Sequence, residues 1–232
     1  MRYPGGKGKT YQHIINVLPS HTTYIETHLG GGAVLRHKKP ADRSIGIDLD
    51  AAVIRRWRYL FPSLADYFES DAVDFLTSQR FAGDEVVYCD PPYLPGTRRR
   101  ARVYRHDYVE SDHIRLLSTL REVPCRVVVS GYPSELYDEW LSDWSTQTFA
   151  AKSHHGVRQE KLWFNFEVPP CLHDARHLGR DFRERQTIKR RLQRLKRRIT
   201  TLSAPERHLL SEWLEDLLQE EEEDAGLLLL ER

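Results

Sequence analysis

Residues 86–93 read Val86-Val87-Tyr88-Cys89-Asp90-Pro91-Pro92-Tyr93. The first four residues are apolar and predict a buried strand, which the two prolines end because proline donates no backbone hydrogen bond. Ligands of open α/β sheets bind at the carboxyl ends of such strands. A carboxylate only accepts hydrogen bonds, and an aromatic ring can stack on a planar base. The stretch therefore predicts a receptor for an amino group on a flat ring.

A glycine-rich turn lies upstream of this stretch. The segment Thr23-Tyr24-Ile25 predicts a strand that runs into Glu26-Thr27-His28-Leu29-Gly30-Gly31-Gly32, and a helix begins at Ala33. A strand, a glycine turn and a helix in this order bring backbone N–H groups close to a bound nucleotide. The turn therefore predicts a nucleotide-type cradle.

Two acidic residues follow the next two predicted strands. The strand Ser44–Ile47 ends at Asp48, about 20 residues after the glycine turn, which is the spacing of a ribose-binding acid. A third strand through Tyr67 and Phe68 leads to Asp71. We expect Asp48 to hold ribose hydroxyls and Asp71 to contact an adenine edge.

The N-terminal segment Arg2-Tyr3-Pro4-Gly5-Gly6-Lys7 supplies a further candidate contact. The glycine pair allows a close approach of the backbone to a ligand, and Lys7 supplies a charge for a carboxylate.

The order of these motifs resembles that of the Dam-type (D12 class) DNA adenine methyltransferases, which have Gly-Gly-Lys, Glu-x-x-x-Gly-x-Gly, two aspartates and Asp-Pro-Pro-Tyr in turn. The resemblance extends from Arg2 to about Phe166. It implies methyl transfer from S-adenosylmethionine to the exocyclic amine of adenine in DNA, and a role in restriction–modification. The catalytic residues that it implies are Asp90, Pro91, Pro92 and Tyr93. The cofactor-binding residues that it implies are Tyr3, Gly6, Lys7, Glu26, Gly30, Gly32, Asp48, Asp71 and Asp90.

Two departures from the family pattern are visible. The family's Pro-Phe after the glutamate is Thr27-His28 here, which changes the expected aromatic wall of the cofactor pocket. The family's sizeable target-recognition insert is also missing, because the interval from Asp71 to Asp90 has room only for a helix over Ala72–Gln79 and one strand. We therefore expect a short or relaxed target sequence.

Three later segments complete the predicted sheet. Strands are expected over Arg126–Ser130, Trp144–Phe149 and Leu162–Phe166, and a substrate-side loop over Gly156–Lys161. The predicted fold is therefore α/β, with a seven-stranded, mostly parallel sheet of the Rossmann-like methyltransferase type in residues 1–168.

The rest of the chain predicts a C-terminal helical hairpin over residues 172–232. A basic helix is expected between Arg176 and Arg198, with a seam of Ile188, Leu192, Leu195, Ile199 and Leu202. A second helix opens at Ser203 and Pro205, and we expect the acidic run Glu220–Asp224 and Gly226 to stop it. The hairpin either folds back on the catalytic domain or presents its cations to nucleic acid, and a homodimer through these helices is a further possibility.

Basic residues in three places are candidates for nucleic-acid contact. A cation cluster directly follows the Asp-Pro-Pro-Tyr stretch, one arginine lies in the expected late loop, and others lie on the basic helix. The candidate residues are Arg98, Arg99, Arg100, Arg102, Arg158, Lys189, Arg190 and Arg194.

Composition limits the remaining possibilities. With 232 residues, 40% of them hydrophobic, and a formal charge of +1, the chain can bury one substantial core plus an appendage. No apolar run approaches the roughly 20 residues that span a membrane, so a cytoplasmic protein is expected. The three cysteines suit reduced thiols. Cys171, His173 and His177 lie close in sequence without an evident fourth ligand, and we predict no metal site.

Three functions remain open at this point. They are adenine methylation in DNA, the same transfer to adenine in RNA or to cytosine in DNA, and nucleic-acid binding without catalysis. Fold analogy alone does not separate DNA from RNA.

Overall fold

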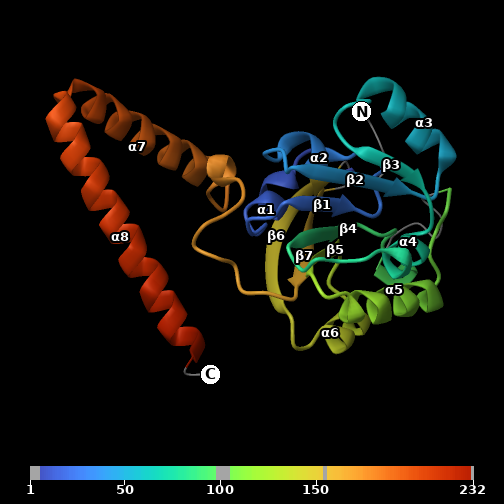
Figure 1. Ribbon diagram of the computed structural model, residues 1–232. Helices are drawn as coiled ribbons and strands as arrows, with labels where there is room; N and C mark the ends of the chain where they lie inside the picture. Colours follow the sequence, from blue (N-terminus) through green and yellow to red (C-terminus); the bar gives the residue numbers. More distant parts are fainter. Residues whose placement is uncertain (1–5, 98–104, 154–155, 231–232) are drawn as a thin grey trace. The chain divides into compact units, whose positions relative to one another are not determined.

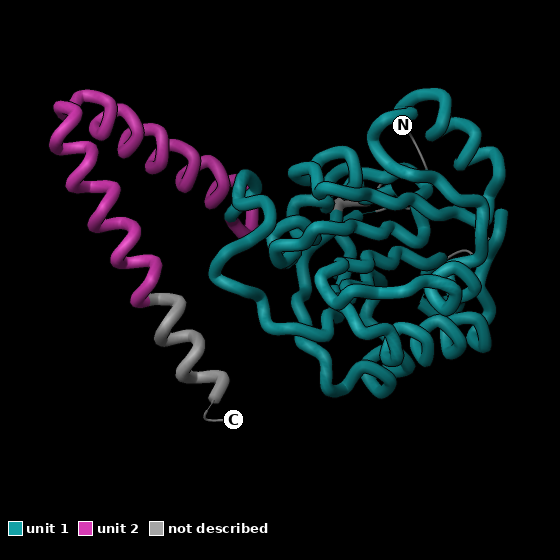
Figure 2. The backbone as a smooth tube through the Cα atoms, in the orientation of Figure 1, with its two compact units in different colours: residues 1–178 teal, residues 179–232 magenta. Residues whose placement is uncertain are grey.

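The computed structural model describes residues 6–97, 105–153 and 156–230, with side chains except at 152, 153 and 221–230 (Figure 1). It divides into two compact units, residues 1–178 and 179–232 (Figure 2). Among the described residues, no helix is both long enough and apolar enough to cross a bilayer.

The first unit is built on a seven-stranded sheet with the strand order β3-β2-β1-β4-β5-β7-β6. Strands β1 to β5 run parallel, whereas β7 pairs antiparallel with both β5 and β6. This confirms the predicted mostly parallel α/β sheet. The strands are β1 Thr23–Glu26, β2 Arg43–Asp48, β3 Asp66–Glu69, β4 Glu85–Cys89, β5 Arg126–Gly131, β6 Ser145–Ser153 and β7 Gly156–Phe164.

Helices cover both faces of the sheet (Figure 1). Helices α1 Tyr11–Ile15, α2 Ala33–His37 and α3 Ala51–Leu60 lie on one face, and α4 Ala72–Ser78, α5 Glu110–Glu122 and α6 Glu135–Trp140 on the other. Successive strand residues alternate between the two cores: Val86 and Tyr88 pack on the first, and Val87 and Cys89 on the second. A sheet buried on both faces explains why Val86–Cys89 of β4 are all apolar.

Two predictions of where a strand or helix begins or ends are wrong. Gly156–Lys161, expected as a loop, belongs to β7, because β6 extends to Ser153 and its backbone pairs with β7 as far as Gly156. The second C-terminal helix, α8 Ala204–Leu230, does not stop at Gly226. A single glycine costs a helix only about 1 kcal/mol, and the leucines that follow are good helix formers.

The basic helix α7 covers Phe182–Thr201, so it begins later than predicted. Asp181 caps it by accepting a hydrogen bond from the Glu184 backbone N–H, and the preceding residues Ala175–His177 form a 3₁₀ turn. The segment before the helix belongs to the first unit, where the buried Asp174 accepts hydrogen bonds from Lys39 N and from Arg176.

The three cysteines differ in accessibility. Cys89 and Cys125 are buried in the sheet, whereas Cys171, in the segment that leads to the second unit, is exposed. Burial raises the pKa of the Cys89 thiol to about 12, so this thiol stays protonated.

Substitution of Gly32 tests the packing of the glycine turn. Gly32 has a φ of 51°, and a Cβ there would lie 2.2 Å from Cζ2 of the fully buried Trp57. We expect Gly32→Ala to lower the free energy of unfolding by about 2–4 kcal/mol. A Cβ on Gly8 meets no atom within 4 Å, so Gly8→Ala should change it by less than about 0.5 kcal/mol. Equal thermal melting temperatures for the two variants would contradict this account.

Candidate active site

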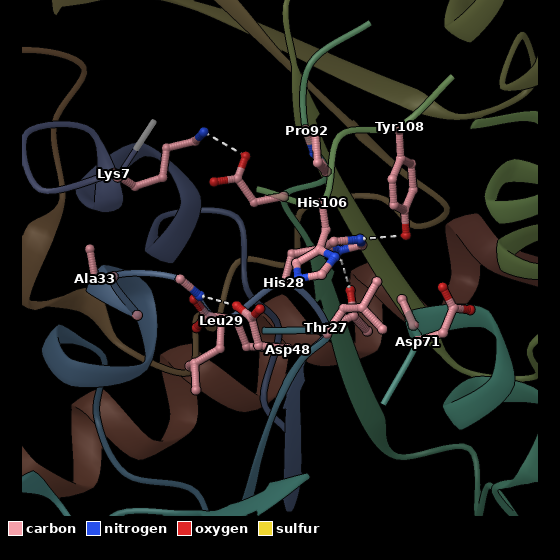
Figure 3. Close-up of a pocket in the computed structure, with 18 of the residues that line it drawn as sticks. Lys7, Thr27, His28, Leu29, Ala33, Asp48, Asp71, Pro92, His106 and Tyr108 are labelled. Atoms are coloured by element: carbon pink, nitrogen blue, oxygen red, sulfur yellow. Dashed lines mark hydrogen bonds and ion pairs between the residues drawn. The ribbon is translucent and has the colours of Figure 1, made fainter. Parts of the chain in front are cut away.

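A cavity of about 780 Å³, including its open mouth, lies at the carboxyl ends of β1, β2, β3 and β4 (Figure 3). The cavity brings together most of the residues that the sequence predicts to bind a cofactor. Those that line it are Gly6, Lys7, Glu26, Gly30, Gly32, Asp48, Asp71 and Asp90, and Pro92 lies beside them.

The Asp90 carboxylate is fixed from two sides. Its Oδ1 accepts hydrogen bonds from Lys7 Nζ at 2.6 Å and from Ser130 Oγ at 2.8 Å. Ser130 is itself fully buried and lies 2.9 Å from the hydroxyl of Tyr88. Asp90 follows β4 and Ser130 lies near the end of β5, so adjacent strands hold the carboxylate at the sheet edge.

Lys7 joins the N-terminal segment to the Asp90–Tyr93 stretch, called the target motif below. Its ammonium also donates to the Tyr93 hydroxyl at 2.5 Å and lies 3.7 Å from Glu160 Oε2. Burial lowers the pKa of Lys7, but the charges of Asp90, Tyr93 and Glu160 outweigh this effect and hold the pKa well above its ordinary value. Lys7, expected to meet a cofactor carboxylate, is thus a permanent cation bound to Asp90.

Glu26 is a buried carboxyl at the end of β1. Its Oε2 accepts hydrogen bonds from Tyr24 Oη and from the backbone N–H of Leu35, both at 3.0 Å. Burial raises the pKa of Glu26 to about 8, although these two hydrogen bonds oppose the shift. The side chain therefore carries a proton at neutral pH and would ionise on meeting a cation.

Asp48 and the glycine turn are locked to each other. The two carboxylate oxygens of Asp48 accept hydrogen bonds from Gly30 N and Asp50 N, each at 2.8 Å. Gly30 and Gly32 have φ values of 43° and 51°, a left-handed conformation that explains the need for glycine at these two positions. Burial raises the pKa of Asp48 against these hydrogen bonds.

Asp71 caps a helix at the far end of the cavity. Its Oδ1 accepts hydrogen bonds from Val73 N and Asp74 N at the start of α4, and Arg115 lies 3.3 Å away. The carboxylate is therefore already ordered where it lines the cavity.

A hydrogen-bonded aromatic pair forms another wall of the cavity. His28 Nε2 lies 3.0 Å from the Tyr108 hydroxyl, and His28 Nδ1 lies 2.9 Å from Thr27 Oγ1 (Figure 3). Burial lowers the pKa of His28 to about 3, so the imidazole is neutral. The polar pair Thr27-His28, which departs from the family's Pro-Phe, thus contributes a neutral ring anchored by the segment that follows the target motif.

The rings of Tyr93 and Tyr132 connect the target motif with Arg158. The Tyr93 and Tyr132 ring centroids are 4.3 Å apart, and the Arg158 guanidinium lies 5.1 Å from the centroid of Tyr132. Tyr93 is only 7% exposed, and Pro91 is buried. Arg158 is thus connected to the predicted site although it lies on β7 rather than in a loop.

Other predicted residues lie elsewhere. Tyr3, Arg98, Arg99, Arg100 and Arg102 are outside the described residues. The cations Lys189, Arg190 and Arg194 are exposed on α7 in the second unit. Cys171 is exposed, and the ring of His173 stacks on that of His21 with their centroids 3.8 Å apart. In the described part of the chain, no group of three or more His, Cys, Asp or Glu residues could hold a metal ion.

Four residues of the site were not predicted from the sequence to belong to it. They are Ser130, Tyr132, His106 and Glu160. Ser130 and Tyr132 lie at the carboxyl end of β5, next to β4, so the rule that parallel strands share a ligand edge could have found them. Glu160 reaches Lys7 from an antiparallel strand whose register the sequence does not reveal. His106 lines the cavity from a segment without periodicity.

The raised pKa of Glu26 predicts a pH-dependent stability. Between the ordinary pKa of about 4.5 and the folded-state pKa of about 8, the folded chain holds a proton that the unfolded chain has lost. This contribution to stability is therefore complete below pH 4.5 and is lost as the pH rises towards 8, by up to about 1.4 kcal/mol per pH unit. Glu26→Gln removes the dependence. Chemical denaturation at pH 5, 6.5 and 8 should show wild type losing stability relative to Glu26→Gln; a constant difference would contradict the assignment.

No curated protein matches this chain. Similar solved structures include a precorrin 8w decarboxylase from Methanobacterium thermoautotrophicum, with 13% identity, 71% of this chain and 94% of that chain covered, and a TM-score of 0.47. The 23S rRNA methyltransferase ErmE shows 11% identity, coverage of 73% and 72%, and a TM-score of 0.44. Magnesium protoporphyrin IX methyltransferase from Synechocystis PCC 6803, solved with bound SAM, shows 12% identity, coverage of 70% and 81%, and a TM-score of 0.47.

A family model matches residues 63–159, a segment that contains Asp71, the Asp90–Tyr93 stretch and Arg158 but not the motifs from Lys7 to Asp48. The model describes the D12 class N6 adenine-specific DNA methyltransferases, which confirms over this segment the family resemblance inferred from the sequence.

Proposed function

We propose that this protein transfers the methyl group of S-adenosylmethionine to the exocyclic amine of adenine in DNA, at a short or relaxed target sequence. The observation that carries the proposal is the position of Asp90. Its carboxylate, held by Lys7 and Ser130, borders the same cavity as Glu26, Asp48 and Asp71.

The residues of the cavity suit the cofactor's functional groups. Glu26 is a buried carboxyl for the methionine ammonium, and Asp48 is an acceptor for ribose hydroxyls. Asp71 is an acceptor for the adenine amine of the cofactor, and Gly30 and Gly32 allow the backbone of the turn to approach the cofactor closely. Lys7, which is bound to Asp90, supports the target side of the site rather than the cofactor carboxylate.

Asp90 would hold the target amine in a reactive geometry. The amine of adenine is a poor nucleophile, because its lone pair is delocalised into the ring. Hydrogen bonds from the amine to the Asp90 carboxylate and the Pro91 carbonyl favour tetrahedral nitrogen and so free the lone pair. When bound, S-adenosylmethionine supplies the electrophilic methyl group. Because Asp90 Oδ1 already accepts two hydrogen bonds, we assign the amine to Oδ2.

Tyr93 is the proposed stacking partner of the extruded base. Extrusion costs a few kcal/mol, and stacking on an aromatic ring returns about 1–3 kcal/mol. Since Tyr93 is buried and its ring contacts Tyr132, a base that stacks on Tyr93 has to displace neighbouring side chains. We assign Arg158, above Tyr132, to a phosphate next to that base, with further phosphate contacts from Arg98–Arg102 and from the cations of α7.

The short target sequence follows from the small space available for recognition. Between Asp71 and Asp90 the chain forms only α4 and β4, so no inserted subdomain reads bases there. Sequence readout then depends on a few side chains, each discriminating by about 1–3 kcal/mol.

Product analysis tests the proposed reaction. The purified protein is incubated with methyl-labelled S-adenosylmethionine and, separately, with duplex DNA, single-stranded DNA and RNA, and the digested nucleosides are identified. We expect labelled N6-methyldeoxyadenosine from DNA, at sites defined by at most a few bases. Label on RNA alone, or on cytosine, would replace the proposal with one of its alternatives. A strictly required site of six or more base pairs would contradict the relaxed target.

Two substitutions separate the target-binding role from the cofactor-binding role. Asp90→Ala should lower methyl transfer by at least about 100-fold while most of the affinity for S-adenosylmethionine remains. Asp48→Ala should instead lose cofactor affinity, because it removes both the ribose acceptor and the anchor of the Gly30 turn. Calorimetric titration with S-adenosylmethionine and a transfer assay measure the two effects, with thermal melting to confirm folding. An active Asp90→Ala enzyme would rule out the mechanism.

A further inference from the structure

The second unit exposes two apolar stripes. The first stripe consists of Ile188, Leu192, Leu195 and Ile199 on α7, with Leu202 directly after the helix. The second consists of Leu209, Leu210, Trp213, Leu214, Leu217 and Leu218 on α8. No residue of α7 is buried, and Leu209 and Trp213 on α8 are 66% and 57% exposed. Helices in proteins owe most of their stability to the packing of an apolar face against another surface. We therefore expect each stripe to pack against a partner.

The two stripes differ in width. At about 100° per residue, the α7 residues of the first stripe cover an arc of roughly 60°, the width of a seam of a and d positions that faces the core of a helix bundle. The stripe on α8 covers an arc of roughly 180°, which suits two neighbouring helices. Closing the hairpin between α7 and α8 of one chain therefore leaves about half of the α8 stripe uncovered.

Charge identifies the chemistry of the missing neighbour. Helix α7 carries nine Lys and Arg residues against one Glu, a formal charge of +8, and α8 carries nine Asp and Glu residues against one Arg, a formal charge of −8. A helix that packs beside α8 should be apolar on one face and basic on its flanks, and α7 has this composition. A hairpin whose two arms have opposite charges is complementary to a copy of itself.

We propose that residues 179–232 form a homodimerisation module in which two hairpins pack as a four-helix bundle. The two α8 helices lie diagonally opposite each other, and each packs between its own α7 and the α7 of the second copy. The outer cations of α7 remain available for phosphates. Two catalytic units are then joined in one assembly, a property that the proposed methyl transfer at a single site does not require.

Sedimentation equilibrium of the full chain between about 1 and 100 μM tests the proposal. We expect the mass of a dimer for the full chain and of a monomer for a chain cut after Leu178, at the boundary of the two units. This cut keeps Leu172, whose bridge to Pro19 belongs to the first unit. A full chain that is monomeric at 100 μM, or a truncated chain that is still dimeric, would overturn the proposal.

A matched pair of substitutions locates the interface. Leu214→Glu and Gln219→Glu each add one negative charge and a good helix former to α8, the first on the apolar stripe and the second on the opposite face. We expect Leu214→Glu to weaken dimerisation at least tenfold and Gln219→Glu to leave it unchanged, with equal helix content by circular dichroism. Equal dimerisation of the two variants would overturn the assignment of the stripe.

The other occupants of the stripe give different results. If it packs on the catalytic unit of its own chain, the full chain is monomeric and the proposal fails. If residues 179–232 only bind nucleic acid, the chain is again monomeric. Truncation then lowers the slope of the salt dependence of nucleic-acid binding by about one unit per lost phosphate contact. Cofactor affinity, measured on the same proteins, reports on the proposed function independently, because the truncation leaves every described residue of the cavity in place.

Discussion

A buried ammonium group cannot be left without partners, and the contacts of Lys7 organise the whole site. Lys7 is 4% exposed, so without Asp90 and Tyr93 its charge would carry a desolvation penalty of several kcal/mol. The pairing attaches the N-terminal segment to the end of β4 and fixes the carboxylate in one rotamer. Ser130 completes the arrangement from β5. The hydrogen bonds from Lys7 and Ser130 thus hold the Asp90 carboxylate in place before a substrate binds. Such preorganisation of a hydrogen-bonding group favours the proposed methyl transfer.

Much of the fold could be predicted because its signals are local. The apolar run Val86–Cys89 predicts a strand buried on both faces, and β4 is such a strand. The glycine turn follows from sterics, since Gly32 leaves no room for a Cβ against Trp57. Asp48, Asp71 and Asp90 each follow a strand, and parallel strands bring their carboxyl ends to one edge. Their convergence on one cavity could therefore be expected, whereas their chemical roles stay predictions.

The features that sequence reasoning missed depend on non-local pairing. Arg158 was expected in a loop, but the register of β6 with β7 places it in a strand opposite Ala151. His28 replaces an aromatic residue of the family pattern, and only its contact with Tyr108, 80 positions later, shows how the wall is rebuilt. Gly226 failed as a stop signal because neighbouring residues with high helix propensity outweigh one glycine.

The uneven burial of the thiols has a practical consequence. Cys89 and Cys125 are enclosed in the sheet, and the pKa of each is raised by burial, to about 12 in both. Thiol-selective dyes react with accessible thiolates and should therefore discriminate strongly in favour of Cys171. Since Cys171 lies shortly before the boundary between the two units, the wild-type chain carries a natural attachment point for a fluorophore at its junction. Energy transfer between labelled copies, or rotational depolarisation of a single label, would then follow the movement of the junction in solution without any engineered cysteine.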